Sequence, residues 1–263
     1  MALAWGGLAA PRATICKPMN ENLLIYASFL FEAVFWLGAY ALILYHAFKE
    51  KTYGVPVVAM CGNIAWEFIF GLNRFPACPV YWADCSPALM TTLTLMAALM
   101  DAVILFTVLY FGRHQFKGPF WLRYFIPLTL AGVAFSFVLQ HSLMGGLYTP
   151  NYYGATVNGS IPEFLQIGLQ GGMFTGWALV LLMGILFIRW LGVREGLEGQ
   201  SFYIAVCMFL GNLGAYFFLL TAAKTIPPSV GWLIGAGLLV NLIYIGMVYQ
   251  RGRALGLNPW RHL

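Results

Sequence analysis

Charged residues are scarce in this 263-residue chain: Asp, Glu, Lys and Arg make up 9% of it, against 61% hydrophobic residues. Soluble domains carry about 25% charged residues, so the composition excludes a soluble globular protein and indicates a membrane protein. Lipid offers no hydrogen bonds to backbone amides, and spanning segments must therefore be helices or a closed barrel. The apolar runs do not alternate with polar residues, which selects helices.

Motifs of several enzyme classes are also missing. The chain has no HExxH, GxSxG or Walker motif, no DDxxD stretch to hold magnesium and diphosphate, and no DxDD acid motif. These absences argue against metalloproteases, serine hydrolases, nucleotide-dependent enzymes and cyclases that ionise a diphosphate. No histidine lies near the five cysteines in a metal-binding spacing, so we expect no metal and no cofactor.

Seven apolar stretches predict an all-α bundle of seven transmembrane helices. They cover residues 22–47, 54–73, 88–112, 120–144, 162–189, 201–223 and 229–250. Residues 1–21 are interpreted as an N-terminal extension without the features of a cleaved signal peptide. Residues 22–250 then form the transmembrane domain and 251–263 a basic cytoplasmic tail.

The basic residues predict an orientation. Ten of the fourteen lie in the tail or in the loops after the first, third and fifth stretches. The positive-inside rule then places the C-terminus in the cytoplasm and the N-terminus outside. This bias accounts for most of the net charge of +5, and no nucleic-acid partner is expected. A bacterial inner membrane and the endoplasmic reticulum both remain open, as does the oligomeric state.

Two further features lie in loops that this orientation places outside. Cys78 and Cys85 flank the segment PVYWAD, and an oxidising compartment would favour a disulfide between them. The triplet Asn158-Gly159-Ser160 is a glycosylation sequon, which matters only in a eukaryotic host.

Ionisable residues inside the predicted spans are few, and each is a functional candidate by default. The intramembrane polar residues of most interest are Glu32, Glu67 and Asp101 in the first three spans, with Asn212 and Asn241 in the last two. Asn63 and Glu67 are four residues apart and share one helix face, so they can hydrogen-bond each other. A carboxyl group in apolar surroundings favours its neutral form, which makes Glu67 a candidate general acid.

Structural interpretations compete with each of these roles. Glu67 can serve as a hydrogen-bond donor between helices, and Asp101 can simply pair with Asn63. Glu32 lies among aromatic residues in FLFEAVFW, where packing can account for it. Glu163 follows a proline at a predicted helix start, where a carboxylate suits the helix dipole regardless of function.

Aromatic residues make up 17% of the chain. Ring faces are electron-rich, and a cavity lined by them can hold a cation without a counter-ion; ordinary core packing is the alternative. A protonated carboxyl facing such a cavity suits protonation of an olefin or epoxide on a lipid-like chain. The residues expected to contact the substrate are Trp36, Asn63, Trp66, Phe70, Asn212, Tyr216, Asn241 and Tyr244.

The block NIAWEF at 63–68 and the run DAVI at 101–104 resemble the membrane-bound terpene cyclases of meroterpenoid and indole-diterpene pathways. The resemblance implies an enzyme that cyclises a prenyl chain on an aromatic or heteroaromatic head group. It also implies that Glu67 is the catalytic acid and that Asp101 is a second catalytic residue.

The last span departs from the family pattern. An acid in the setting D-x-x-Y is replaced here by Asn241, followed by Leu242, Ile243 and Tyr244. An amide cannot donate a catalytic proton, which favours Glu67, supported by Asp101, as the proton source.

Three other functions compete with this interpretation. A small-molecule or proton-coupled transporter would use the intramembrane acids, but polar residues thin out towards the predicted cytoplasmic side and no half-repeat is visible. A retinal receptor is disfavoured because residues 229–250 contain no lysine for a Schiff base. A non-catalytic assembly factor remains open.

Overall fold

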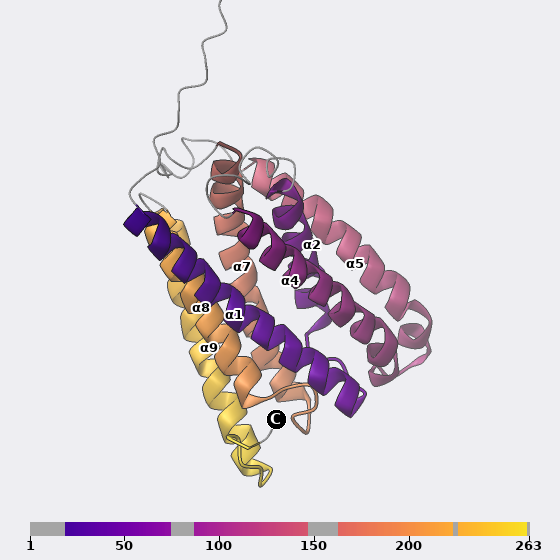
Figure 1. The fold of residues 1–263 in the computed structure, drawn as a ribbon. Helices are drawn as coiled ribbons and strands as arrows, with labels where there is room; N and C mark the ends of the chain where they lie inside the picture. The colour runs from indigo at the N-terminus through magenta and orange to yellow at the C-terminus, as the bar shows by residue number, and fades with distance from the viewer. Residues whose placement is uncertain (1–18, 75–86, 147–162, 223–225, 262–263) are drawn as a thin grey trace, which may run out of the picture.

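The computed structural model describes residues 19–74, 87–146, 163–222 and 226–261, and within these ranges it contains helices and no strand (Figure 1). The α-helices are α1 (Met19–Glu50), α2 (Val57–Arg74), α4 (Pro87–Thr107), α5 (Pro119–Gly146), α7 (Glu163–Val193), α8 (Phe202–Ala222) and α9 (Pro228–Ala254). A π-helical turn, η2 (Val108–Gly112), and a 3₁₀ turn, η3 (Arg113–Gln115), extend α4. The all-α prediction is therefore confirmed for the described part of the chain.

Six of these helices are long and apolar enough to cross a membrane by length and composition. The apolar part of α2, Val57–Ile69, is shorter. This helix starts at Val57 rather than at residue 54, directly after Pro56, whose lack of an amide hydrogen suits the start of a helix. The count of seven spans, the orientation and the division into extension, domain and tail stay predictions. Cys78, Cys85 and the sequon lie outside the described residues.

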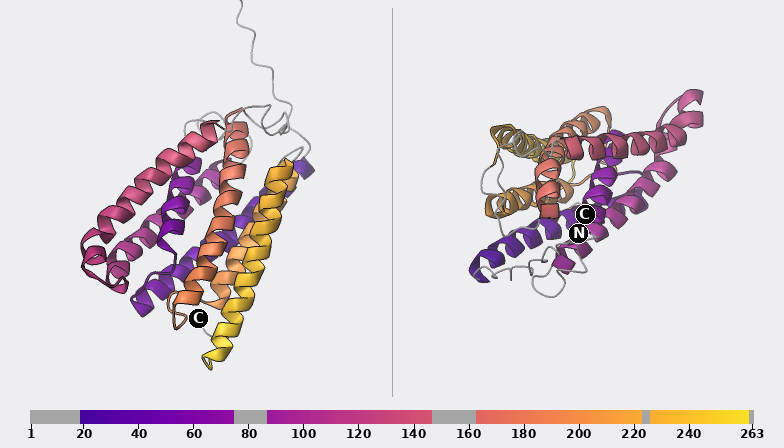
Figure 2. Two further views of the ribbon diagram at one scale, coloured as in Figure 1. Left: turned by 180° about the vertical axis from the view of Figure 1, so that it is seen from behind. Right: turned by 90° about the horizontal axis from the view of Figure 1, so that it is seen from above.

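Six helices form a ring. In order of contact the ring runs α1, α4, α2, α7, α9 and α8, and α8 closes it by packing on α1 (Figures 1 and 2). Helix α5 lies outside the ring against α2 and α7. The ring therefore brings α1 and α2, from the start of the chain, together with α7 and α8 from its second half.

Glycines on α8 let it approach α1 closely. A Cβ atom on Gly214 would lie 2.6 Å from the backbone nitrogen of Glu32, and one on Gly211 would lie 2.7 Å from the Trp36 ring. Small residues at such positions are typical of helix contacts in membranes. The α1–α8 seam thus holds the backbone of Glu32 and the ring of Trp36 in place.

A hydrogen-bonded group joins the end of α7 to the α1–α2 loop. The Arg194 guanidinium donates to Gln115 Oε1 at 2.6 Å, and Gln115 donates to Thr52 Oγ1 at 2.6 Å. The guanidinium carbon lies 3.8 Å from the Trp190 ring centroid and 4.9 Å from that of Tyr53. We call Thr52, Tyr53, Gln115, Trp190 and Arg194 the Arg194 cluster.

Candidate active site in the helix ring

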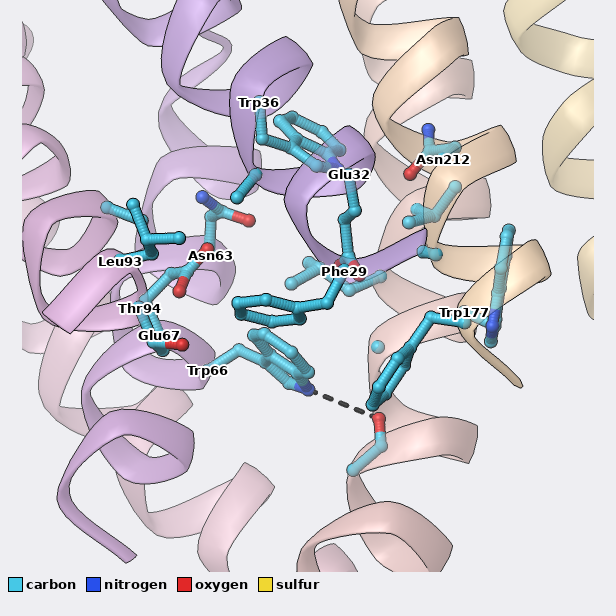
Figure 3. A pocket seen from close by; sticks show the side chains of 18 of the residues that line it. Phe29, Glu32, Trp36, Asn63, Trp66, Glu67, Leu93, Thr94, Trp177 and Asn212 are labelled. Atoms are coloured by element: carbon cyan, nitrogen blue, oxygen red, sulfur yellow. Dashed lines mark hydrogen bonds between the residues drawn. The ribbon is translucent and has the colours of Figure 1, made fainter. Parts of the chain in front are cut away.

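A cavity opens between α1, α2, α4, α7 and α8 (Figure 3). Its lining is largely apolar, and the aromatic residues in it are Phe29, Trp36, Tyr40, Trp66, Trp177 and Phe218. The Trp66 indole is anchored across the cavity wall, because its Nε1 donates to the Gly172 carbonyl on α7 at 3.3 Å. The cavity is therefore lined by aromatic rings, one of which, Trp66, is hydrogen-bonded to the facing helix.

The polar lining of this cavity is acidic or neutral. Its members are Glu32, Tyr40, Asn63, Glu67, Thr94 and Asn212, and no lysine, arginine or histidine is found among the described residues that line it. The described part of this wall therefore offers a ligand hydrogen-bond acceptors and neutral donors but no cationic side chain.

A buried hydrogen-bond network holds Glu67. The Tyr40 hydroxyl donates to Glu67 Oε1 at 3.3 Å, while Asn63 Nδ2 donates to Tyr40 Oη and to Asp101 Oδ2, both at 2.7 Å. We call these four residues the Asn63 network; it joins α1, α2 and α4. Satisfied buried networks of this kind hold their members in one arrangement.

Glu67 and Asp101 occupy different places in the network. Glu67 lines the cavity, whereas Asp101 is 1% exposed and is not among the described lining residues. Asn63 stands between Asp101 and the cavity. A ligand in the cavity can thus touch Glu67 directly, while Asp101 is linked to Glu67 by hydrogen bonds through Asn63 and Tyr40.

Comparison with known families now adds independent information. The profile of the Pyr4-like transmembrane terpene cyclases matches residues 18–250, nearly the whole chain. The chain belongs to this family. It is thus a multi-pass membrane protein of a terpene cyclase family, and the family resemblance carried by the motifs is confirmed.

Curated relatives agree with this assignment. The chain is 28% identical over 181 residues to the Pyr4-family terpene cyclase mfmH of Annulohypoxylon moriforme, a match that covers 68% of this chain and 63% of the relative. It is 22% identical over 204 residues to terpene cyclase pyr4 of Aspergillus fumigatus (78% and 73% covered). It is also 22% identical over 209 residues to asnovolin H synthase nvfL of Aspergillus novofumigatus (77% and 74%). No solved structure matches this protein.

The structure gathers five of the predicted site residues of this Pyr4-like protein around the cavity: Trp36, Asn63, Trp66, Glu67 and Asn212. Asp101 lies one hydrogen bond behind them. Asn63 was expected to bond Glu67 directly; instead, its amide donates to Tyr40 and Asp101, and the Tyr40 hydroxyl reaches Glu67.

Other predicted site residues lie elsewhere. Asn241 is 1% exposed and donates to the Gly237 carbonyl of its own helix at 2.7 Å. Tyr244 is fully buried, and its hydroxyl donates to Gln200 at 3.3 Å. Neither of them, nor Tyr216, is among the described residues that line the cavity. The side chains of Phe70 and Glu163 are not described.

Tyr40 and Thr94 were missed as site residues. A signal for Tyr40 exists in the sequence, since Glu32, Trp36 and Tyr40 follow at intervals of four and so share one face of α1. Glu32, for which packing was an adequate explanation, lies on this face and lines the cavity. Nothing in the local sequence marks Thr94.

Proposed function

We propose that this protein is a transmembrane terpene cyclase in which Glu67 protonates an olefin or terminal epoxide of a prenyl chain. The substrate carries that chain on an aromatic or heteroaromatic head group. The observation that supports the proposal best is the position of Glu67, a carboxyl group held by Tyr40 on the wall of an aromatic cavity.

Glu67 is suited to donate a proton for two reasons. The cavity wall around it is largely apolar, and apolar surroundings favour the proton-carrying form of a carboxyl group. Tyr40 binds Oε1, and a carboxyl group fixed through one oxygen can carry its proton on the other. General acids positioned in this way contribute about 10²–10⁴-fold to a rate.

The cavity wall suits the later steps. Protonation forms a new bond to hydrogen and leaves a carbocation, which the remaining double bonds of the chain attack in turn. Aromatic faces within about 6 Å of a cation stabilise it, and Trp36, Trp66 and Trp177 line the same space. The cyclisation ends in one of two ways: the last carbocation loses a proton, or a substrate oxygen attacks it and then releases its own proton. In both cases the product is an isomer of the substrate.

Asp101 and Asn241 receive separate roles in this proposal. Asp101 is a positioning residue, because it orients Asn63, which in turn binds Tyr40. Asn241, in place of the family's last-span acid, bonds within its own helix and is assigned no part in proton transfer. A single cavity-facing proton donor on α2 then starts the reaction.

The proposed topology keeps seven spans with the N-terminus outside. Helix α2 has 18 residues, which at about 1.5 Å per residue is about 27 Å, close to the ~30 Å thickness of the hydrocarbon core. This topology places the start of α1 and the end of α2 on the outer side.

The experiment that tests the proposal is a product assay in D₂O. Membranes with wild-type protein or the Glu67→Gln variant receive a farnesylated phenol, either as the olefin or as the terminal epoxide. We expect the olefin to give a cyclised wild-type product with one new carbon-bound deuterium, and E67Q to give none while its melting temperature stays near that of wild type. Near-normal turnover by E67Q would refute the role of Glu67.

The two substrates separate the two modes of initiation. Cyclisation of the olefin shows direct protonation of carbon, whereas cyclisation of the epoxide alone shows that the proton goes to oxygen. In that second case the deuterium appears on an exchangeable hydroxyl, and loss of turnover in E67Q becomes the decisive readout.

A further inference from the structure

The side-chain oxygen of Asn212 is a buried acceptor at the cavity wall. This residue on α8 is 1% exposed and lines the cavity. Its Oδ1 atom is buried and has no hydrogen-bond partner among the residues that the structure describes. A buried acceptor without a partner costs about 1–3 kcal/mol, and such atoms in native proteins call for an explanation. A ligand that donates a hydrogen bond supplies one.

Glu32 provides a second acceptor at the same seam. It lines the cavity from α1, and its backbone is held against α8 at Gly214, two residues beyond Asn212. In Figure 3, Glu32 and Asn212 lie on one side of the cavity and Glu67 on the other, with the Phe29 and Trp66 rings between them. The two acceptors therefore face the same space from adjoining helices.

Along α1, Glu32 is separated from Tyr40, the residue that holds Glu67, by about two turns of helix. Glu67 is held by Tyr40, and Glu32 precedes Tyr40 by eight residues on α1, which is about 12 Å along the helix axis at about 1.5 Å per residue. Aromatic side chains occupy the wall between the two ends. The cavity thus has a proton-donor end and an acceptor end with an apolar stretch between them.

We infer that Glu32 and Asn212 form a head-group subsite that accepts hydrogen bonds from an O–H or N–H donor on the substrate. This inference rests on the proposed function and deepens it. It orients the substrate: the reacting terminus of the prenyl chain lies at Glu67, and the head group lies at the α1–α8 seam. It also names the class of head group, one with a phenolic or enolic hydroxyl or an N–H beside the prenyl chain.

A matched pair of ligands tests the subsite by binding alone. The E67Q protein, which is expected not to turn over, is titrated in nanodiscs with farnesylphenol and with its methyl ether, and the quenching of tryptophan fluorescence is followed. Sites built to bond a hydroxyl discriminate strongly against the analogue that lacks it. We expect the phenol to bind tenfold or more tightly than the ether.

The chain offers a matched control for the key variant. Asn212→Leu in the E67Q background should reduce the preference for the phenol to about threefold or less, because the acceptor is gone. Asn241→Leu should leave the preference unchanged: Asn241 is also 1% exposed with an unpartnered Oδ1 in the described structure, yet it does not line the cavity. Asn212→Ala replaces the leucine variant if that protein does not fold.

The results are decisive in either direction. An unchanged preference in N212L, equal binding of phenol and ether by the parent protein, or binding of neither would each overturn the subsite. The D₂O assay on wild type separates this from the proposed function. Cyclisation by wild type with an unchanged preference in N212L rejects the subsite alone. A preference lost in N212L, when wild type cyclises neither the olefin nor the epoxide, rejects the proton-donor role alone.

Discussion

Two polar groups of this bundle, the Asn63 network and the Arg194 cluster, use hydrogen bonds in different ways. The Asn63 network is built from uncharged donors and two acids, and one of its members, Glu67, faces a cavity. The Arg194 cluster contains a cation whose donors reach Gln115 and Thr52 and whose plane lies against Trp190. The first group leaves an acid accessible to a ligand, while the cation of the second group binds other residues of the protein.

Access to a cavity distinguishes a functional from a structural buried polar group in this membrane protein. Tyr53 and Arg194 lie outside the six apolar spans, and burial raises the pKa of Tyr53 and lowers that of Arg194, although each partly offsets the change in the other. Arginine stays charged throughout, so its burial is tolerated because its donors are bonded. Glu67 also has a bonded partner in Tyr40, but unlike Arg194 it faces a cavity that a ligand can enter.

Among the residues that support Glu67 or the fold, the largest effect is expected from Asn63→Leu. The Asn63 amide donates to both Tyr40 and Asp101 at 2.7 Å, so its loss removes the support of Glu67 and leaves the Asp101 carboxyl without this donor. We expect turnover to fall about 100-fold, the size typical of a catalytic group displaced by about 1 Å. Turnover of the farnesylated phenol and the melting temperature measure the two consequences. Retention of more than a third of wild-type turnover would contradict a positioning role for the network.

Arg194→Ala should show the opposite pattern. Loss of the guanidinium removes hydrogen bonds to Gln115 and Thr52 and uncovers Trp190, which we expect to cost about 2 kcal/mol of stability. Thermal unfolding in detergent should show a lower melting temperature, while turnover at low temperature stays within twofold of wild type. Arg253→Ala, at an exposed position on α9, is the control and should change neither. Loss of turnover in R194A without loss of stability would break the distinction between the two groups.

The sequence predicts where the helices of this protein lie better than it predicts which helix faces pack together. Long apolar stretches and their breaks locate each helix to within a few residues, because the bilayer imposes both length and hydrophobicity. Sequence spacing also places Asn63 and Glu67 on one face of α2. The pairing of Asp101 with Asn63, offered as a structural alternative, is present at 2.7 Å.

What the sequence does not predict depends on which helix faces meet. Tyr40 enters the network because α1 packs on α4, next to α2, so that its hydroxyl comes within reach of Asn63. No local pattern specifies that arrangement. Asn241 and Asn212 are equivalent by depth and residue type, yet only Asn212 is among the residues that line the cavity. The Arg194 cluster unites a loop, a 3₁₀ turn and a helix end, so it is visible only once the ring has closed.

Asp101→Asn sharpens the division of labour inside the network. The amide keeps the shape of the carboxyl group, and its oxygen can still accept the hydrogen bond from Asn63 Nδ2. If Asp101 only positions Asn63, we expect turnover to fall about tenfold or less, which corresponds to about 1.4 kcal/mol. The same D₂O assay compares D101N with E67Q. An equal and complete loss in both variants would identify Asp101 as an essential proton carrier rather than a positioning residue.

The smallest effect is expected from Thr52→Val, which removes one hydroxyl from the Arg194 cluster. Thr52 is 3% exposed and accepts from Gln115 at 2.6 Å and from Arg194 at 3.4 Å. Valine has a similar shape, so we expect a loss of about 1 kcal/mol of stability and unchanged turnover. A double-mutant cycle with Arg194→Ala tests whether the residues act together: residues in one network show coupling of about 0.5–3 kcal/mol. Strict additivity would mean that the Thr52 hydroxyl has no part in what Arg194 contributes. Arg194 would then stabilise this end through its bonds to Gln115 and to the Glu198 carbonyl and through its contact with the Trp190 ring.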